Sequence, residues 1–143
     1  MNFYSINWLA VLVSAIASMA IGFLWYSPVL FATTWMKLMG VKCDTPEEKA
    51  QMQKEAAPLY AQTFVMTLIS AVFLALVITR MFVPSEDLLR GLKISFGVWL
   101  GFVATVQYTG ALFSKKPKQL FLIDTGYQLV CYLVMGAIIT KWQ

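Results

Sequence analysis

The sequence predicts an all-α membrane protein: a four-transmembrane-helix bundle with an interfacial amphipathic helix after the first span. Hydrophobic residues make up 59% of the 143 residues and charged residues only 13%, too few to cover a water-soluble domain. Four stretches are nearly free of charge and long enough to cross a bilayer, namely 1–36, 56–79, 94–114 and 119–140. They do not alternate apolar and polar residues as the strands of a membrane barrel do, so each should be helical.

The first uncharged stretch is too long for one span, because 36 helical residues would extend about 54 Å. Ser27-Pro28 offers the break, with serine as a cap and proline at the first helical position. We therefore expect a transmembrane helix at about 6–26 and an interfacial helix at about 28–39, ended by Gly40. Residues 1–8 contain no Lys or Arg, which disfavours a cleaved signal peptide.

The segment 41–58 is the only long polar one, and Thr45-Pro46-Glu47-Glu48 has the form of a capping box. It predicts a short surface helix at about 46–56, ended by Pro58. Three further transmembrane helices should follow, with Pro84 and Pro117 at the tight connections: about 59–82, 88–113 and 119–141. No repeat or linker divides the chain, so residues 1–143 are expected to form one integral-membrane domain, with 28–58 as its interfacial and polar segment.

The basic residues predict the orientation of the bundle. Four spans put both termini and the 83–87 connection on one side, and the segment 28–58 and the turn 114–118 on the other. The second side carries seven basic residues, Lys37, Lys42, Lys49, Lys54, Lys115, Lys116 and Lys118, and the first side carries four, Arg80, Arg90, Lys93 and Lys141. This asymmetry favours a cytoplasmic second side and periplasmic termini.

Composition also argues against several kinds of chemistry. Histidine is absent and the cysteines, Cys43 and Cys131, are isolated, so neither a Cys/His metal site nor a thiol redox pair can be assembled. We expect no metal and no cofactor. The net charge of +4 comes from basic residues between apolar stretches, not from a basic stripe with interleaved aromatic residues, so nucleic acid is not an expected partner.

Small residues recur at intervals of four along the predicted spans, a spacing that lets helix backbones approach closely in lipid. The first span has Ser14, Ser18 and Gly22, the third Gly97 and Gly101, and the fourth Gly136. These residues are interpreted as helix-packing positions. Spacing alone leaves open whether Gly97 and Gly101 pack within the bundle or between subunits.

The fourth span carries a polar row that includes Asp124 and Gln128, which should face protein or water because lipid cannot satisfy such groups. Helical depth brings Gln107 and Tyr108 of the third span to the same end of the bundle. Together with Tyr26 and Tyr127 these residues form a candidate polar recess, which would open toward the segment 28–58. Asp124 itself has two interpretations, as an interfacial cap at the start of the helix or as a ligand, ion or proton site.

Several motifs are similar to those of a bacterial membrane family catalogued as domain of unknown function 1761. They begin with Trp25-Tyr26-Ser27-Pro28 and continue through Trp99-Leu100-Gly101-Phe102, Leu120-Phe121-Leu122-Ile123-Asp124, Gly126-Tyr127 and Met135-Gly136. The resemblance covers nearly the whole chain and implies a multi-pass protein of the bacterial inner membrane. It implies no reaction, substrate or cofactor. Ala32-Thr33 departs from the Gly-Lys expected after Leu30-Phe31.

Three functions are compatible with these observations. The first is a non-catalytic oligomeric scaffold or partner-binding membrane protein that uses residues 28–58 as its cytoplasmic contact. The second is a small transporter or channel-like homo-oligomer with a polar recess at Asp124, although the first span has no acid of the kind found in small multidrug transporters. The third is a lipid-modifying enzyme, whose best candidates, Asp124 with Tyr127 or Tyr108, lack a paired base, nucleophile or metal ligand. We expect no catalytic activity.

Overall fold

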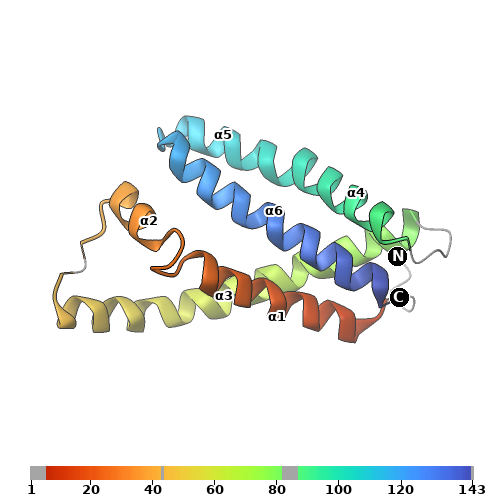
Figure 1. Cartoon of the computed structure of the whole chain (residues 1–143), viewed down its shortest axis with the longest axis horizontal. Helices are drawn as coiled ribbons and strands as arrows, with labels where there is room; N and C mark the ends of the chain where they lie inside the picture. Colours follow the sequence, from red (N-terminus) through yellow and green to blue (C-terminus); the bar gives the residue numbers. More distant parts are fainter. Residues whose placement is uncertain (1–5, 43, 82–86, 143) are drawn as a thin grey trace.

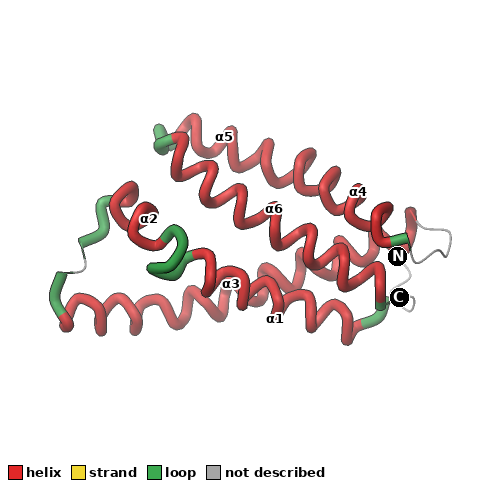
Figure 2. The backbone as a smooth tube through the Cα atoms, in the orientation of Figure 1, coloured by secondary structure: helices red, strands yellow, loops and turns green. Residues whose placement is uncertain are grey.

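The computed structural model describes residues 6–42, 44–81 and 87–142, and every regular element in these ranges is a helix (Figures 1 and 2). The elements are α1 (Trp8–Trp25), α2 (Ala32–Met39), α3 (Pro46–Met81), α4 (Leu88–Val98), the π-helix η2 (Trp99–Ala104), α5 (Thr105–Phe113) and α6 (Lys118–Lys141). The all-helical prediction is confirmed for the described residues. Pro84 lies outside them.

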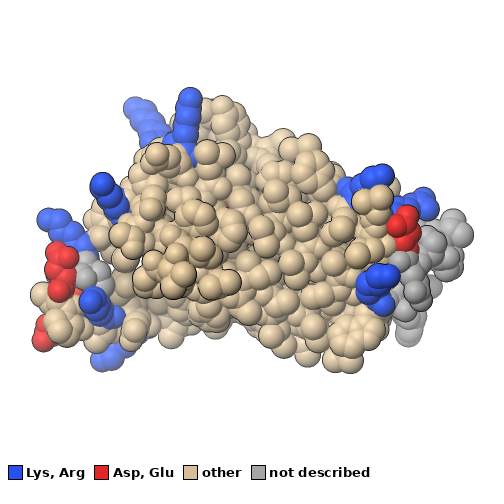
Figure 3. All heavy atoms as spheres, in the orientation of Figure 1, with Lys and Arg blue, Asp and Glu red and all other residues tan. Residues whose placement is uncertain are grey.

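Four described helical segments are long and apolar enough to cross a membrane: α1, α3, Leu88–Phe113, which joins α4, η2 and α5, and α6. On the face drawn in Figure 3, Lys, Arg, Asp and Glu gather at the two ends of the molecule and leave an uncharged belt between them. Such a belt suits the hydrocarbon core of a bilayer, where charged side chains are costly. The described residues therefore contain four helices that are long and apolar enough to span a membrane, as expected from the sequence.

Helix α6 lies at the centre of the bundle, packed against α1, α3 and α4 (Figure 1). Its buried residues Cys131, Met135 and Ile139 form one core with Val11 of α1 and with Leu74 and Ile78 of α3. The polypeptide ends of the described chain come together at one end of the bundle (Figure 1). There the Asn7 side-chain amide donates a hydrogen bond to the Trp142 carbonyl over 2.6 Å.

Two glycines allow α4 and α6 to approach closely. A Cβ atom on Gly91 would overlap the Thr140 side chain, and one on Gly136 would overlap Ser95. Ser95 is fully buried, and its hydroxyl donates to the Gly91 carbonyl over 2.9 Å. Hydrophobic attraction cannot hold helices together in lipid, so this close approach supplies the van der Waals contact that joins α4 to α6.

The chain breaks after α1, but in a different way from the expected one. Ser27 does not cap the following helix: its hydroxyl donates to the Leu24 carbonyl, 2.7 Å away, at the end of α1. A turn follows, in which the Phe31 N–H donates to the Trp25 carbonyl over 3.1 Å. Helix α2 therefore begins at Ala32 and not at residue 28, because the turn uses the backbone groups that an earlier start would need.

Local end signals are confirmed at Gly40 and Thr45. Gly40 adopts φ +68° after α2, and the Val41 N–H donates to the Met36 carbonyl over 3.0 Å. At the start of α3 the Glu48 N–H donates to Thr45 Oγ1 over 3.2 Å, and Glu48 Oε2 accepts from the Thr45 N–H over 3.1 Å. The N–H groups of Thr45 and Asp44 hold the pKa of the Glu48 carboxyl, in the polar part of the helix, below its ordinary value.

The expected helix end at Pro58 is wrong. Helix α3 runs through Pro58 without interruption for 36 residues, from Pro46 to Met81. Proline removes one backbone hydrogen bond from a helix interior, but the flanking residues, rich in Ala, Glu, Gln, Lys and Leu, are strong helix formers. The result is one helix about 54 Å long, whose polar beginning projects past the rest of the bundle (Figure 1).

The expected third span is a single helical unit, but its middle winds as a π-helix at Trp99–Ala104. A π-segment accommodates an additional residue and turns the helix that follows relative to the one before. The unit therefore presents Gly91 and Ser95 to α6 in its first half and Tyr108 to Phe121 of α6 in its second half.

Candidate functional site

Three consecutive residues of α6 accept hydrogen bonds from aromatic side chains. Trp25 Nε1 donates to the Ile123 carbonyl over 3.1 Å, the Tyr26 hydroxyl donates to Asp124 Oδ1 over 2.9 Å, and Trp99 Nε1 donates to the Thr125 carbonyl over 3.2 Å. The donors come from both flanks of α6, two from the end of α1 and one from η2. Residues 123–125 are thus fixed between the other helices at the end of the bundle where α2 lies.

Aromatic rings extend this arrangement to α2. The ring of Tyr26 lies 5.5 Å from that of Tyr127 and 6.0 Å from that of Trp35, both edge-on, and the ring of Trp25 lies 4.9 Å from that of Phe31. Edge-to-face pairs at such distances add to the stability gained from burial. The aromatic cluster therefore holds α2 against the end of α1 and places Asp124 beside it.

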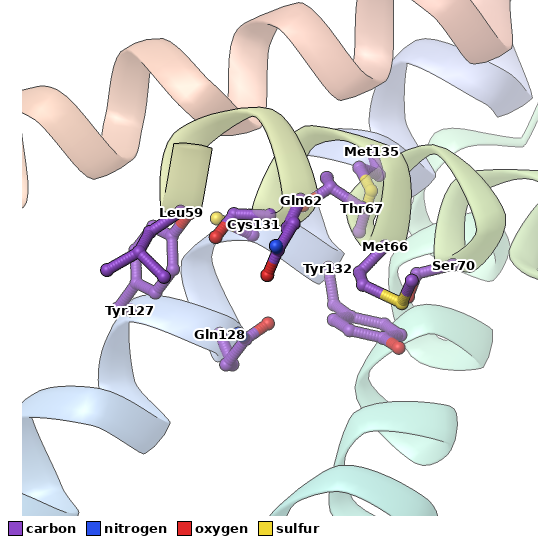
Figure 4. A pocket seen from close by; sticks show the side chains of 11 residues that line it. Leu59, Gln62, Met66, Thr67, Ser70, Tyr127, Gln128, Cys131, Tyr132 and Met135 are labelled. Atoms are coloured by element: carbon purple, nitrogen blue, oxygen red, sulfur yellow. The ribbon is translucent and has the colours of Figure 1, made fainter. Parts of the chain in front are cut away.

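A cleft of about 330 Å³ lies between α3 and α6, next to the aromatic cluster (Figure 4). Its volume is at the lower end of the range of small-molecule sites. Tyr127, Cys131 and Met135 of α6 are buried along it, whereas Leu59 and Met66 of α3 are 58% and 60% exposed, so the cleft is open along its α3 side. The remaining lining residues are Gln62, Thr63, Thr67, Ser70, Gln128 and Tyr132.

The six residues of the candidate recess lie in three neighbouring parts of the structure. Tyr26 and Asp124 are hydrogen-bonded to each other, whereas Tyr127 and Gln128 line the cleft between α3 and α6. Tyr127 also donates to the Ser18 carbonyl of α1 over 3.2 Å.

The other two residues, Gln107 and Tyr108, lie on α5. Tyr108 packs on Phe121 and lines a separate cavity of about 220 Å³ that also includes Lys115, Lys116 and Lys118. Gln107 has a buried side-chain oxygen without a hydrogen-bond partner among the described residues. That all six residues line a single recess stays a prediction.

The packing residues expected from the sequence also lie in different surroundings. Ser14 and Ser18 are fully buried, and a Cβ atom on Gly22 would lie 2.9 Å from the Tyr127 hydroxyl. By contrast, a Cβ atom on Gly97 or Gly101 would meet nothing within 4 Å. The small residues of α1 and Gly136 thus lie at contacts within the chain, and those of the third span lie on its outer surface.

Sequence reasoning did not assign a site to the α3 side of the cleft or a partner to Trp99. Gln62 and Thr63 were recognisable as polar residues at the correct end of their span, but their spacing did not show which helix they face. Thr67 and Ser70 have the same ambiguity. The signal that could have found them is the polar stripe Gln62, Thr63, Thr67, Ser70 on one side of an otherwise apolar helix.

The chain is helical throughout its regular described elements, and its four long apolar helices suggest a multi-pass membrane protein. A family model described as "Protein of unknown function (DUF1761)" matches residues 9–140, and the chain belongs to that family. The search of curated proteins and the search of solved structures each found no match. Within the described residues no group of three or more His, Cys, Asp or Glu side chains is placed to hold a metal ion.

Proposed function

We propose that the protein is a non-catalytic scaffold of the bacterial inner membrane that acts as a homo-oligomer. The outer face of Leu88–Phe113 is the surface that joins the copies. The single observation that carries this proposal is the exposed surface around Gly97 and Gly101, where a Cβ atom would meet nothing within 4 Å. Elsewhere in the same chain, glycines at Gly91 and Gly136 accommodate a neighbouring helix.

The chemistry of this face suits contact with another helix. Thr105 and Thr109 are exposed beside the glycines, and their hydroxyls donate to the carbonyls of Gly101 and Thr105 over 2.8 and 3.0 Å. Their hydrogen-bonding groups are therefore already satisfied within the helix. The row of glycines and threonines therefore offers only small side chains, and small side chains let two helices approach closely in a bilayer.

Burial supports the same conclusion. Leu88–Phe113 is the least apolar of the four candidate spans and also the least covered: 17% of its apolar window is buried, against 28% in α1 and α3 and 39% in α6. A weakly apolar helix gains least from contact with lipid. A second copy of the chain would cover it with matching small residues.

In the proposed scaffold, the end of the bundle that carries α2 and the polar beginning of α3 provides the surface for a protein partner. Residues 46–55 of α3 are exposed and charged, and Lys42 and Lys37 lie nearby in sequence. The larger number of basic residues at this end favours a cytoplasmic position, with the chain termini periplasmic. There the segment 28–58 is available to a protein partner. Asp124 has a structural role in this scheme, as the acceptor of the Tyr26 hydrogen bond.

The test measures oligomeric state in lipid nanodiscs or vesicles by single-molecule photobleaching of a labelled chain at several ratios of protein to lipid. Wild-type protein should show more than one copy per particle, and Gly101→Leu should reduce it to single copies. Gly110→Leu is the matched control, because Gly110 is an equally open glycine of the same helical unit outside the four-residue spacing. A monomeric wild type, or equal behaviour of the two variants, would refute the proposal.

Cross-linking provides an independent readout. In a chain with both native cysteines replaced, Gly97→Cys should form a disulfide between copies under mild oxidation. Phe73→Cys, which is exposed on the outer surface of α3, should not. Cross-linking at position 73 alone would place the contact on α3 and contradict the proposed surface.

A further inference from the structure

Polar side chains are spread along the cleft between α3 and α6, although it lies within the apolar part of two membrane helices. From Leu59 to Ser70 it follows α3 for about 16 Å, and Gln62, Thr63, Thr67 and Ser70 lie on this wall. Figure 4 shows Gln62 and Gln128 directed into the same space from the two helices, with Met66 and Tyr132 farther along. No charged side chain of the described residues lines it.

The two amides have no partner within the described protein. Neither Gln62 nor Gln128 makes a side-chain hydrogen bond to another described residue, although each carries two N–H donors and an acceptor oxygen. Both line the cleft, where Gln62 is exposed and Gln128 is partly buried. Lipid chains offer an amide no hydrogen-bond partner. An unoccupied cleft would therefore leave the two amides without hydrogen bonds, which costs free energy.

The three hydroxyls on the α3 wall of the cleft are also unengaged. Elsewhere in the membrane helices Ser18, Ser95, Thr79, Thr105 and Thr109 each donate to a carbonyl one turn earlier in the same helix. Thr63, Thr67 and Ser70 make no such bond within the described chain. Three hydroxyls and two amides therefore face one space with their donors and acceptors available.

These features define the chemistry of an occupant. It must carry both hydrogen-bond donors and acceptors, because the wall offers both. It should be uncharged, because no lysine, arginine or acid lines the cleft to balance an ionised group. It must also be partly apolar, since Leu59, Met66, Cys131 and Met135 complete the wall. The open α3 side allows the rest of a longer molecule to remain in the bilayer.

We infer that this cleft binds the head of an uncharged membrane lipid that bears hydroxyl and carbonyl oxygens, as a diacylglycerol does. The oxygens lie against the amides of Gln62 and Gln128, and one acyl chain passes Met66 and leaves through the open side into the bilayer. The inference does not depend on self-association, because the cleft is formed by α3 and α6 and the proposed contact between copies by α4, η2 and α5.

The experiment uses the whole protein in phosphatidylcholine nanodiscs that contain a photoactivatable diacylglycerol with the reactive group near the glycerol. Parallel samples contain phosphatidylcholine or phosphatidic acid with the same reactive group. After illumination, mass spectrometry identifies the labelled residues. The diacylglycerol should label Leu59, Met66 and Cys131, and the two charged-head probes should label the outer surface of the bundle instead.

Variants then test the residues that carry the inference. Gln62→Leu combined with Gln128→Leu should reduce cleft labelling by the diacylglycerol on the order of tenfold, since two neutral hydrogen bonds are lost. Gln119→Leu is the control, an exposed amide on the first turn of α6 outside the cleft. Met66→Trp fills the cleft from an exposed position and should block labelling without disturbing the core.

Four outcomes would overturn the inference: equal cleft labelling by the charged-head probes, labelling unchanged in the double amide variant, labelling unchanged in Met66→Trp, or a cleft occupied by a second copy. The last appears as a chain-to-chain cross-link from Met66→Cys. Circular dichroism and thermal unfolding of each variant show whether it retains the fold. If the double amide variant unfolds, Met66→Trp decides the question.

Discussion

The hydroxyl of Tyr26 donates a hydrogen bond to Oδ1 of Asp124 over 2.9 Å, across 98 residues of sequence. It joins the residue that follows α1 to the first part of α6. Its neighbours, the Trp25 and Trp99 hydrogen bonds to residues 123 and 125, act on the same turn of α6. The acid in the fourth span is therefore part of the contact between the end of α1 and α6.

This contact predicts how Asp124 responds to substitution. Asp124→Asn keeps an acceptor oxygen for Tyr26 and should change the free energy of unfolding by less than about 1 kcal/mol, whereas Asp124→Leu and Tyr26→Phe should each cost about 1–2 kcal/mol. Thermal unfolding in detergent measures the series. Because the two groups are partners, the double variant Tyr26→Phe/Asp124→Leu should cost less than the sum of the single ones. Strictly additive costs would show that the bond contributes nothing.

The close approach of α4 and α6 predicts that alanine at Gly136 costs much more stability than alanine at Gly97. Gly136→Ala adds a Cβ atom where Ser95 already lies, so it should lower the stability of the folded chain by about 1–3 kcal/mol. Ser95→Gly should restore part of that loss by removing the overlapping group. Gly97→Ala, which meets no atom within 4 Å, is the control and should leave thermal unfolding of the single chain unchanged. A similar loss for both alanine variants would contradict the packing described for α4 and α6.

Helix α2 is expected to lie in the membrane interface. It has eight residues, buries only Ala32, and holds Trp35 beside the ring of Tyr26. Eight helical residues extend about 12 Å and cannot cross a bilayer. The difference in fluorescence between the native chain and Trp35→Phe isolates the emission of Trp35. Brominated lipids with shallow bromines should quench that emission more than lipids brominated at the bilayer centre, and the reverse order would place α2 inside the hydrocarbon core.

The hydrogen bond between Asn7 and Trp142 predicts that both ends of the chain lie on the same side of the membrane. Reporters that fluoresce only in the cytoplasm should remain dark at either end if the side with seven basic residues is cytoplasmic. Fusion of the same reporter within residues 40–45 should give bright cells. Two bright ends would reverse the orientation but keep the fold, and one bright end would contradict an even number of spans.

Much of the fold was predictable because its signals are local. The charge-free stretches define the spans, and Gly40 and the Thr45–Glu48 pair define helix ends through backbone groups within a few residues. The predicted helix end at Pro58 was wrong. A proline removes one backbone hydrogen bond from the helix, but the helix-forming residues on both sides decide whether the helix continues. The π-helix at Trp99–Ala104 has no comparable local signal.

For the candidate site, the sequence predicted how far along each helix the residues lie, but not which neighbouring helix they face. Residue counting placed Tyr26, Gln107 and Asp124 near one end of the bundle. It could not show that Tyr26 turns toward Asp124 or that Gln128 turns toward α3, because the facing of a helix depends on the neighbours that pack against it. The outward position of Gly97 and Gly101 has the same origin: their spacing is equally compatible with a contact inside or outside the chain.

The hydrogen bond from Asn7 to the Trp142 carbonyl means that the path of the chain nearly closes on itself. A short peptide joining these two positions would turn the protein into a ring without stretching any helix, and the ring could be reopened at another connection. Opening it near Gly40, after α2, would move both ends to the opposite side of the membrane while every helix kept its direction. The order of the four spans along the gene is therefore separable from their arrangement in the bilayer.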